Sequence, residues 1–171
     1  MNKKGHVLNA VLLALGLGVV LSVSPTSDLT MATAQGAGAT IAELFLPVVL
    51  GALFPDVDTA FGRHRKTLHN LPVLAVFLFY PVYFGNLHYV WVGVATHYLL
   101  DVVGSKRGIA LFYPLSPQEY DLPTGVATSS KWANPVTLVV SAVELAALAL
   151  VHYYVVALDT GLQQAATMFG L

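Results

Sequence analysis

Histidine and aspartate side chains gather at the ends of apolar segments in this chain of 171 residues. His97 and Asp101 lie at i and i+4 at the end of one such run. On a helix this spacing puts both side chains on one face, with Cβ atoms about 5 to 6 Å apart, which is close enough to bind one ion. A structural His–Asp hydrogen bond is the alternative. Because ionisable groups are costly in apolar helices, a metal site is favoured.

Two further segments carry residues of the same types. Pro55 ends a second apolar run, and Asp56 and Asp58 follow it, where two carboxylates can point at one cation or at two neighbouring ones. A polar helix cap is the alternative for this pair. In the segment 63–70, His64 and His69 could supply imidazoles, and His69 is the better candidate because it lies where the next helix begins.

The same segment also carries positive charge. Arg63, Arg65 and Lys66 could bind an anionic phosphate, since arginine offers bidentate geometry to such a group. The alternative is a basic loop held near anionic lipid headgroups.

The composition indicates a membrane protein. Hydrophobic residues make up 56% of the chain and charged residues only 10%, against about 25% charged in soluble domains. The net charge of −1 and the lack of a long basic stripe predict no nucleic-acid partner. Cysteine is absent, so a metal would be held by imidazole and carboxylate.

Five apolar segments predict an all-α, polytopic membrane protein that forms one domain over residues 1–171. About five transmembrane helices are expected. The segments run over about 7–23, 39–54, 71–84, 87–103 and 136–158, with longer loops at 24–38 and 105–135. The third and fourth are short for a full span and predict a tight helical hairpin. The first could instead be a secretory signal cleaved near Ala32-Thr33-Ala34, but a retained helix is favoured.

The distribution of positive charge predicts the orientation. With the amino terminus in the cytoplasm, all eight lysines and arginines fall on the cytoplasmic side of an inner, plasma membrane. The same orientation places the candidate metal ligands on that side, although the charge rule did not use them. His88 and His152 fall toward the other side and are left out of the predicted site. Glu43 and Glu144 lie inside apolar segments, where each could line a polar path or pair with a neighbouring group.

The motifs resemble a known family in order and spacing. They are Lys4-Gly5-His6, Leu53-Phe54-Pro55-Asp56-Val57-Asp58, His64-Arg65 with His69, His97-Tyr98-Leu99-Leu100-Asp101, and Gly108-Ile109-Ala110-Leu111-Phe112-Tyr113-Pro114. Over residues 5 to about 115 they resemble the YdjM-like family of inner-membrane proteins regarded as metal-dependent hydrolases. This chain has Lys66 and Leu68 where members usually carry glycine and threonine. A more remote likeness is to the zinc-dependent phospholipase C and single-strand nuclease group.

The resemblance implies roles for individual residues. His6, Asp56, His69, His97 and Asp101 would be metal ligands, and Asp58 a ligand or the catalytic general base. The favoured divalent metal is zinc, with manganese or magnesium as alternatives.

The predicted function is a membrane-bound, metal-dependent hydrolase of a phosphoester or lipid-linked substrate at the cytoplasmic face. Arg63, Arg65, Lys106 and Arg107 would bind the substrate phosphate, and membrane lipids would be the partners. The alternative is a non-catalytic membrane protein, either a divalent-ion transporter or a regulatory or structural binding partner. A transporter would place its ligands near the bilayer midplane, whereas here they fall at helix ends.

Overall fold

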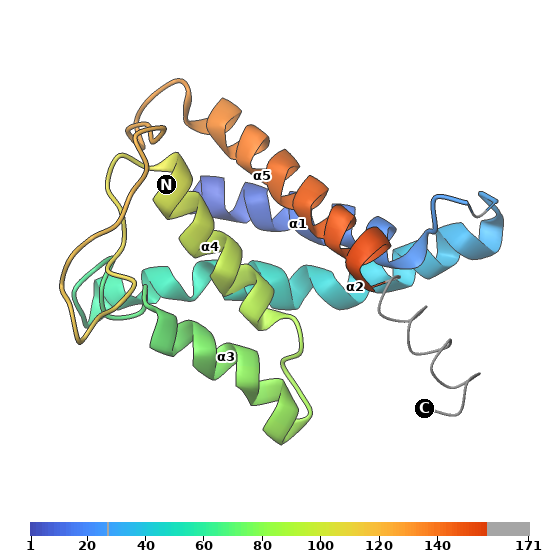
Figure 1. Cartoon of the computed structure of the whole chain (residues 1–171), viewed down its shortest axis with the longest axis horizontal. Helices are drawn as coiled ribbons and strands as arrows, with labels where there is room; N and C mark the ends of the chain where they lie inside the picture. The colour runs from blue at the N-terminus through green and yellow to red at the C-terminus, as the bar shows by residue number, and fades with distance from the viewer. Residues whose placement is uncertain (27, 157–171) are drawn as a thin grey trace.

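The computed structural model describes residues 1–26 and 28–156, and this part of the chain is helical without strands (Figure 1). The element order is α1 (Lys3–Ser22), α2 (Met31–Leu53), the 3-10 helix η1 (Pro55–Ala60), α3 (Leu71–Phe84), α4 (Val90–Gly104), α5 (Ala133–Leu150) and the π-helical turn η2 (Val151–Val156). The all-helical prediction is therefore confirmed for the described residues.

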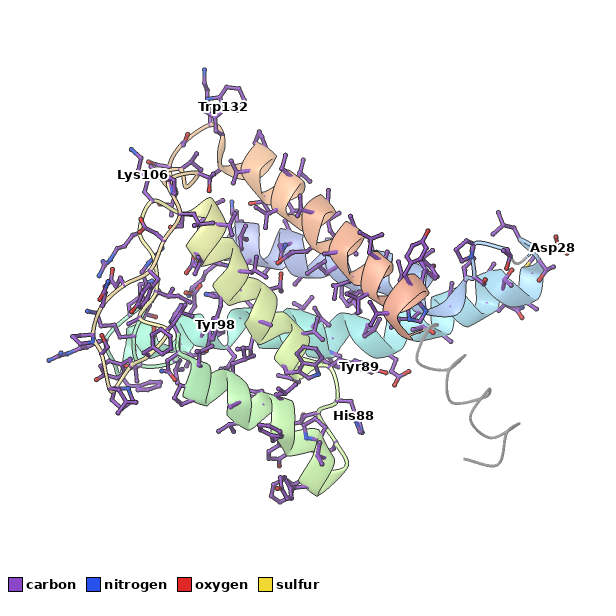
Figure 2. The ribbon with its side chains drawn as sticks, in the orientation of Figure 1. Asp28, His88, Tyr89, Tyr98, Lys106 and Trp132 are labelled. Atoms are coloured by element: carbon purple, nitrogen blue, oxygen red, sulfur yellow. The ribbon has the colours of Figure 1, made fainter. Side chains whose placement is uncertain are left out.

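The helices form a bundle with α2 and α4 at its centre. α1 packs against α2 and α5, α2 packs against α4, and α3 contacts α4 on the outer side (Figure 1). The amino terminus, η1 and the long loop before α5 all lie at one end of the bundle. Figure 2 shows Lys106 and Trp132 on loops at this end and Asp28 at the opposite end. Residues far apart in the sequence are thereby brought to one end of the molecule.

The start of α2 corrects the predicted loop at 24–38. The helix already begins at Met31, because Thr30 and Thr33 form a capping box in which each side chain bonds the backbone N–H of the other. A capping box satisfies N–H groups that the first turn would otherwise leave unpaired. The residues that follow are alanines, glycines and small polar groups, and their lack of apolar periodicity hid the first two turns of this helix.

Helix length separates the five helices into two classes. Three helical segments are long and apolar enough to cross a membrane: Lys3–Ser22, Met31–Ala60 and Ala133–Val155. The helices α3 and α4 have 14 and 15 residues, or about 21 and 22 Å, which is short of the roughly 30 Å of hydrocarbon. The predicted short hairpin is confirmed, and Gly85 ends α3 with a φ of 68°, a conformation that glycine adopts without strain. The final residues of the fifth predicted segment, 157 and 158, lie outside the described residues.

Two glycines allow α2 and α4 to pack with their backbones in contact. A Cβ atom added at Gly93 would lie 2.0 Å from the Val48 carbonyl oxygen, and one added at Gly51 would lie 2.1 Å from the Val90 carbonyl oxygen. Both obstacles are backbone atoms, so a side-chain rotation cannot relieve the clash. The distance between α2 and α4, which carries His97, depends on these two positions.

We expect Gly93→Ala to force α2 and α4 apart and to lower the free energy of unfolding by about 1 to 3 kcal/mol, the usual cost of overpacking. Thermal unfolding of the detergent-purified protein measures this. Gly36→Ala is the matched control, because Gly36 lies in α2 with nothing within 4 Å of an added Cβ, and it should be neutral or slightly stabilising. Equal stability of the two variants would contradict the close packing.

Candidate metal centre

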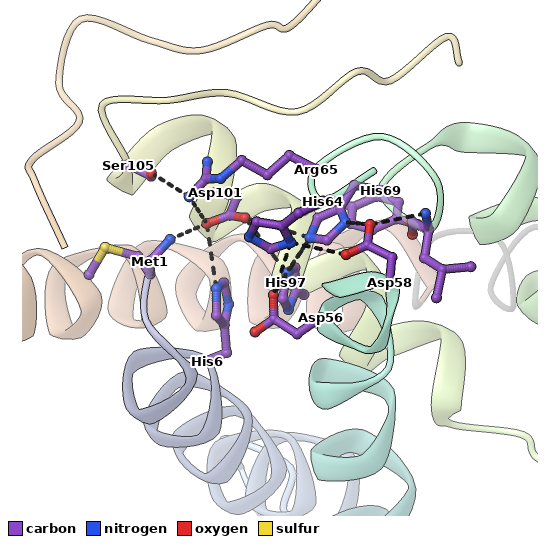
Figure 3. Close-up of polar contacts among 12 residues, drawn as sticks. Met1, His6, Asp56, Asp58, His64, Arg65, His69, His97, Asp101 and Ser105 are labelled. Atoms are coloured by element: carbon purple, nitrogen blue, oxygen red, sulfur yellow. Dashed lines mark hydrogen bonds and ion pairs between the residues drawn. The ribbon is translucent and has the colours of Figure 1, made fainter. Parts of the chain in front are cut away.

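All six residues predicted as metal ligands or catalytic base meet at one end of the bundle (Figure 3). They come from four separate segments: the first turn of α1, the η1 helix, the segment before α3, and the last two turns of α4. In this order they are His6, Asp56 and Asp58, His69, and His97 and Asp101. All six side chains are buried, and those of His6, Asp58, His69 and His97 are fully so.

Four nitrogen and oxygen atoms of these residues that could ligate a metal ion face one another. His69 Nε2 and His97 Nε2 are 3.1 Å apart, and Asp56 Oδ1 lies 3.8 and 3.9 Å from them. Asp101 Oδ2 lies 3.9 Å from His69 Nε2 and 3.6 Å from His97 Nε2. Tetrahedral zinc with nitrogen and oxygen ligands at about 2.0 to 2.2 Å separates its donors by about 3.3 to 3.6 Å. The observed separations, 3.1 to 3.9 Å, lie on both sides of this range, so small shifts of the side chains would bring the atoms to the distances of such an ion.

Hydrogen bonds from the Nδ1 atoms of His69 and His97 fix the tautomer of both rings. His97 Nδ1 lies 2.6 Å from the Ala52 carbonyl oxygen, and His69 Nδ1 lies 3.0 Å from Asp58 Oδ2. Both oxygens are acceptors, so each Nδ1 carries the hydrogen and donates it. In the neutral rings the two Nε2 atoms then bear lone pairs.

The Nε2 pair therefore lacks a hydrogen to share. Burial, with a smaller effect from the neighbouring His97, lowers the pKa of His69 to about 4, so the His69 ring is neutral near pH 7. Two neutral Nε2 atoms 3.1 Å apart point their lone pairs at each other, an arrangement that a proton or a metal ion between them relieves. The arrangement of these nitrogen and oxygen atoms is thus suited to a metal ion.

His6 gives a second sign of a missing partner. Its ring is fully buried, and neither ring nitrogen has a hydrogen-bond partner among the residues that the structure describes. The ring stacks on that of His97 with centroids 3.6 Å apart, and its Nε2 lies 3.4 Å from Asp101 Oδ1. An unsatisfied buried polar group costs about 1 to 3 kcal/mol. A bound ion would remove this cost, because His6, His97 and Asp101 each offer a donor atom within one small cluster.

Asp58 is placed to hold imidazoles in position. Its carboxylate accepts hydrogen bonds from His69 Nδ1 and from His64 Nδ1, both at 3.0 Å, and from the Leu68 N–H at 3.4 Å. A carboxylate behind a ligating histidine fixes the ring and raises its basicity. The predicted catalytic role of Asp58 stays a prediction, while its contact with the back of His69 is a feature of the structure.

His64 is the other imidazole that the segment 63–70 offers, and it is not among the predicted metal ligands. It lies at the rim, with its side chain 41% exposed and its Nδ1 4.0 Å from Asp56 Oδ1. With Asp56 and His69 it forms a second group of donors that could hold an ion.

Asp101 also contacts two positively charged groups. The amino group of Met1 donates a hydrogen bond to its carboxylate, and the Arg65 guanidinium lies 3.7 Å from it. Sequence reasoning missed Met1, because nothing in the pattern places the chain end against α4. The two cations offset the negative charge of a carboxylate that is 1% exposed.

Arg65 is buried rather than open to solvent. It has a φ of 67°, and its guanidinium donates to the Ser105 hydroxyl at 3.2 Å, to the Gly108 carbonyl at 3.3 Å and to the Arg107 carbonyl. These bonds attach the segment before α3 to the loop after α4.

The other predicted phosphate-binding residues lie at the surface. The Arg107 side chain forms a two-point ion pair with Glu119 at 2.8 and 2.9 Å, which raises the pKa of Arg107 and lowers that of Glu119. Arg63 and Lys106 are exposed on loops at the same end of the bundle. Binding of a phosphate by these residues stays a prediction.

The fold and the site together define a helical membrane protein with a buried histidine and aspartate cluster suited to a metal ion. A family model agrees with this class. The model of the YdjM inner membrane protein family matches residues 1–165, and the chain belongs to that family. The match extends past the motifs, which end near residue 115, and includes α5. No curated protein and no solved structure gives a significant match.

We expect Asp58→Asn to weaken metal binding by about 10- to 100-fold without abolishing it, the usual effect of removing a carboxylate behind a ligating histidine. Titration against a chelating indicator measures the affinity. His69→Ala, which removes the ligand itself, should cost far more. If Asp58→Asn lost as much affinity as His69→Ala, Asp58 would be a direct ligand and the positioning role would be wrong.

Proposed function

We propose that the protein is a membrane-bound, metal-dependent hydrolase whose substrate is a phosphoester carried on a lipid. The observation that carries this proposal is the pair of facing, lone-pair-bearing Nε2 atoms of His69 and His97, with the carboxylates of Asp56 and Asp101 beside them. The inner-membrane family and the three long apolar helices support the setting.

His69, His97, Asp56 and Asp101 would hold the ion, with His6 as a further donor. Imidazole and carboxylate ligands suit zinc best among the common divalent ions, with manganese and magnesium as the alternatives. A divalent ion at such a centre lowers the pKa of a bound water toward about 7 and polarises a phosphoryl oxygen.

The two aspartates of η1 would have different tasks. Both oxygens of Asp58 are occupied by imidazole N–H groups, so Asp58 would keep the His69 ring oriented. The Asp56 carboxylate makes no hydrogen bond among the described residues and is the less buried of the two. It is the better placed to contact the ion and to accept a proton from the attacking water.

The position of the centre favours a substrate at the membrane surface. The centre lies at the start of α1 and the end of α4, beside Arg65 and Ser105 of the neighbouring loops (Figure 3). The exposed Arg63 and Lys106 are two residues and one residue away from these in the sequence. A lipid headgroup would lie at this depth, and the two side chains would attract its phosphate. Placing this end in the cytoplasm follows from the positive charges of the loops and is part of the proposal. A transporter, in contrast, would hold its ion near the midplane on broken helices.

Metal content tests the centre directly. We expect the detergent-purified protein to retain zinc or another divalent ion in stoichiometric amount, and the variant His97→Ala/Asp101→Ala to lose it, as measured by elemental analysis. His88→Ala/Asp121→Ala is the matched control, because it removes the same two residue types from exposed positions outside the centre. Absence of metal from the wild-type protein after loading with each candidate ion would refute the proposal.

Turnover tests the reaction. The metal-loaded protein in mixed micelles should release phosphate or a phosphorylated headgroup from phospholipid, measured by phosphate assay and mass spectrometry. Asp56→Asn should lower the rate constant kcat by about 100-fold or more, the usual contribution of a general base. Stoichiometric metal without turnover on any phosphoester lipid would leave a metal-binding membrane protein and exclude this hydrolase.

A further inference from the structure

A second polar cluster lies deeper in the bundle and is not part of the metal centre. Asn9 of α1, Thr96 of α4, and Ser141 and Glu144 of α5 are all buried. The Asn9 amide donates to Glu144 Oε2 at 2.6 Å and to the Ser141 hydroxyl at 2.9 Å. The Thr96 hydroxyl lies 2.5 Å from Asn9 Oδ1 and 2.8 Å from Glu144 Oε1. Glu144 thus pairs with polar side chains of two other helices rather than with its own backbone or a tyrosine.

Counting hydrogens in this cluster shows where a proton must lie. The four contacts just described and the bond from the Ser141 hydroxyl to the Thr137 carbonyl make five. Each of the five needs one hydrogen. The Asn9 amide supplies two, and the Thr96 and Ser141 hydroxyls supply one each. Thr96 cannot donate to both Asn9 and Glu144, so the fifth hydrogen comes from a protonated Glu144 carboxyl. No basic group forms an ion pair with Glu144 among the described residues, which agrees with a neutral acid in this apolar setting.

An apolar pocket of about 360 Å³ begins beside the cluster. Thr96 and Glu144 line one part of it, and the rest of its wall is leucine, valine, alanine and aromatic side chains from α1, α2, α4 and α5. Leu21, Leu99 and Leu148 of this wall are 43%, 47% and 37% exposed, so the pocket opens at the side of the bundle. In a bilayer that side faces lipid hydrocarbon.

The metal centre, the polar cluster and the pocket lie next to one another along two helices. On α1 the order is His6, Asn9 and then Leu13; on α4 most pocket residues, such as Val92, precede Thr96 and His97, while Leu99 lies beyond them. Figure 2 shows Tyr89, another pocket residue, at the start of α4, away from the metal-centre end. The sequence of environments is thus an ion site, a band of neutral hydrogen-bonding groups and a hydrocarbon-lined space. A phosphoester lipid likewise carries its phosphate at one end of an apolar tail.

We propose that the apolar pocket binds the hydrocarbon tail of the lipid whose phosphoester the metal centre receives. The inference rests on the proposed function for the identity of the headgroup. The tail site itself follows from the pocket, its open side and the neutral cluster at its inner end.

Photocrosslinking tests the tail site on the full chain. The protein is reconstituted in phosphatidylcholine vesicles that contain a phosphatidylglycerol with a diazirine near the end of one acyl chain, and labelled peptides are quantified after irradiation. We expect α1 residues 13–21 and α4 residues 91–99 to be labelled several-fold more than the outward face of α3 at Val76 and Phe79, which are 62% and 56% exposed. Equal labelling of the pocket and the α3 face would overturn the inference.

A pair of variants on α5 distinguishes the pocket from the general lipid-facing surface. Ala147 and Val143 are both exposed on this helix, but only Ala147 lines the pocket. Ala147→Trp should therefore lower pocket labelling several-fold, and Val143→Trp should leave it unchanged. If Ala147→Trp fails to fold, Ala95→Trp fills the same pocket from α4. The same labelling in the filled and control variants would contradict the tail site.

Failure of the tail site and failure of the proposed hydrolase are separable. Preferential pocket labelling that persists in His97→Ala/Asp101→Ala supports the tail site whether or not the wild-type protein binds metal. Metal and turnover in a protein that shows no pocket preference would overturn the tail site and leave the hydrolase standing.

Glu144→Gln tests the hydrogen count. A glutamine amide offers the same donor to Thr96 and the same acceptor to Asn9 as a neutral acid, so the thermal midpoint and the pocket labelling should match those of the wild-type protein. Glu144→Leu leaves both partners unpaired and should lower the midpoint clearly. If Glu144→Gln destabilised the protein as much as Glu144→Leu, the carboxyl would not carry the inferred proton.

Discussion

The facing Nε2 atoms of His69 and His97 are the constraint on which the rest of the site depends. Each ring is held from behind by an acceptor on another element: the Ala52 carbonyl at the end of α2 for His97, and the η1 carboxylate Asp58 for His69. The His97 bond requires α4 to lie against α2, which the glycine contacts between these helices allow. The packing of the bundle therefore sets the direction of the two Nε2 atoms. Their lone pairs face a common point where a cation would be bound favourably.

The apolar surroundings explain why the polar groups occur in two compact clusters. A buried polar group must find a partner inside the protein, because neither hydrocarbon nor an apolar core supplies one. The Asn9 cluster meets this condition with its own hydrogens once Glu144 carries a proton. The candidate metal centre does not, since within the described part of the chain neither His6 nitrogen has a hydrogen-bond partner. This difference separates a cluster that is complete by itself from one in which buried nitrogens stay unsatisfied.

Sequence patterns could predict most of the helices and the ligand residues, but not the atomic roles. The apolar run over 71–84 predicted the bounds of α3 correctly, and the cost of buried ionisable groups pointed to His97 and Asp101. Spacing could not distinguish Asp56 from Asp58, because only the folded η1 turn directs Asp58 toward the back of His69. Arg65 resembled an exposed phosphate ligand, yet its left-handed backbone turns the side chain inward to backbone carbonyls. The partners of Glu144 lie on other helices, and no local pattern connects them.

X-ray absorption at the zinc edge tests the central claim most directly, because it reports the ligands of the ion itself. For the zinc-loaded protein, the account predicts a shell of about four nitrogen and oxygen donors at roughly 2.0 to 2.1 Å, with outer-shell scattering from at least two imidazoles. The imidazole scattering should decrease in His97→Ala. A shell of water oxygens without imidazole scattering would contradict the account, since the ion would then be bound somewhere other than between His69 and His97.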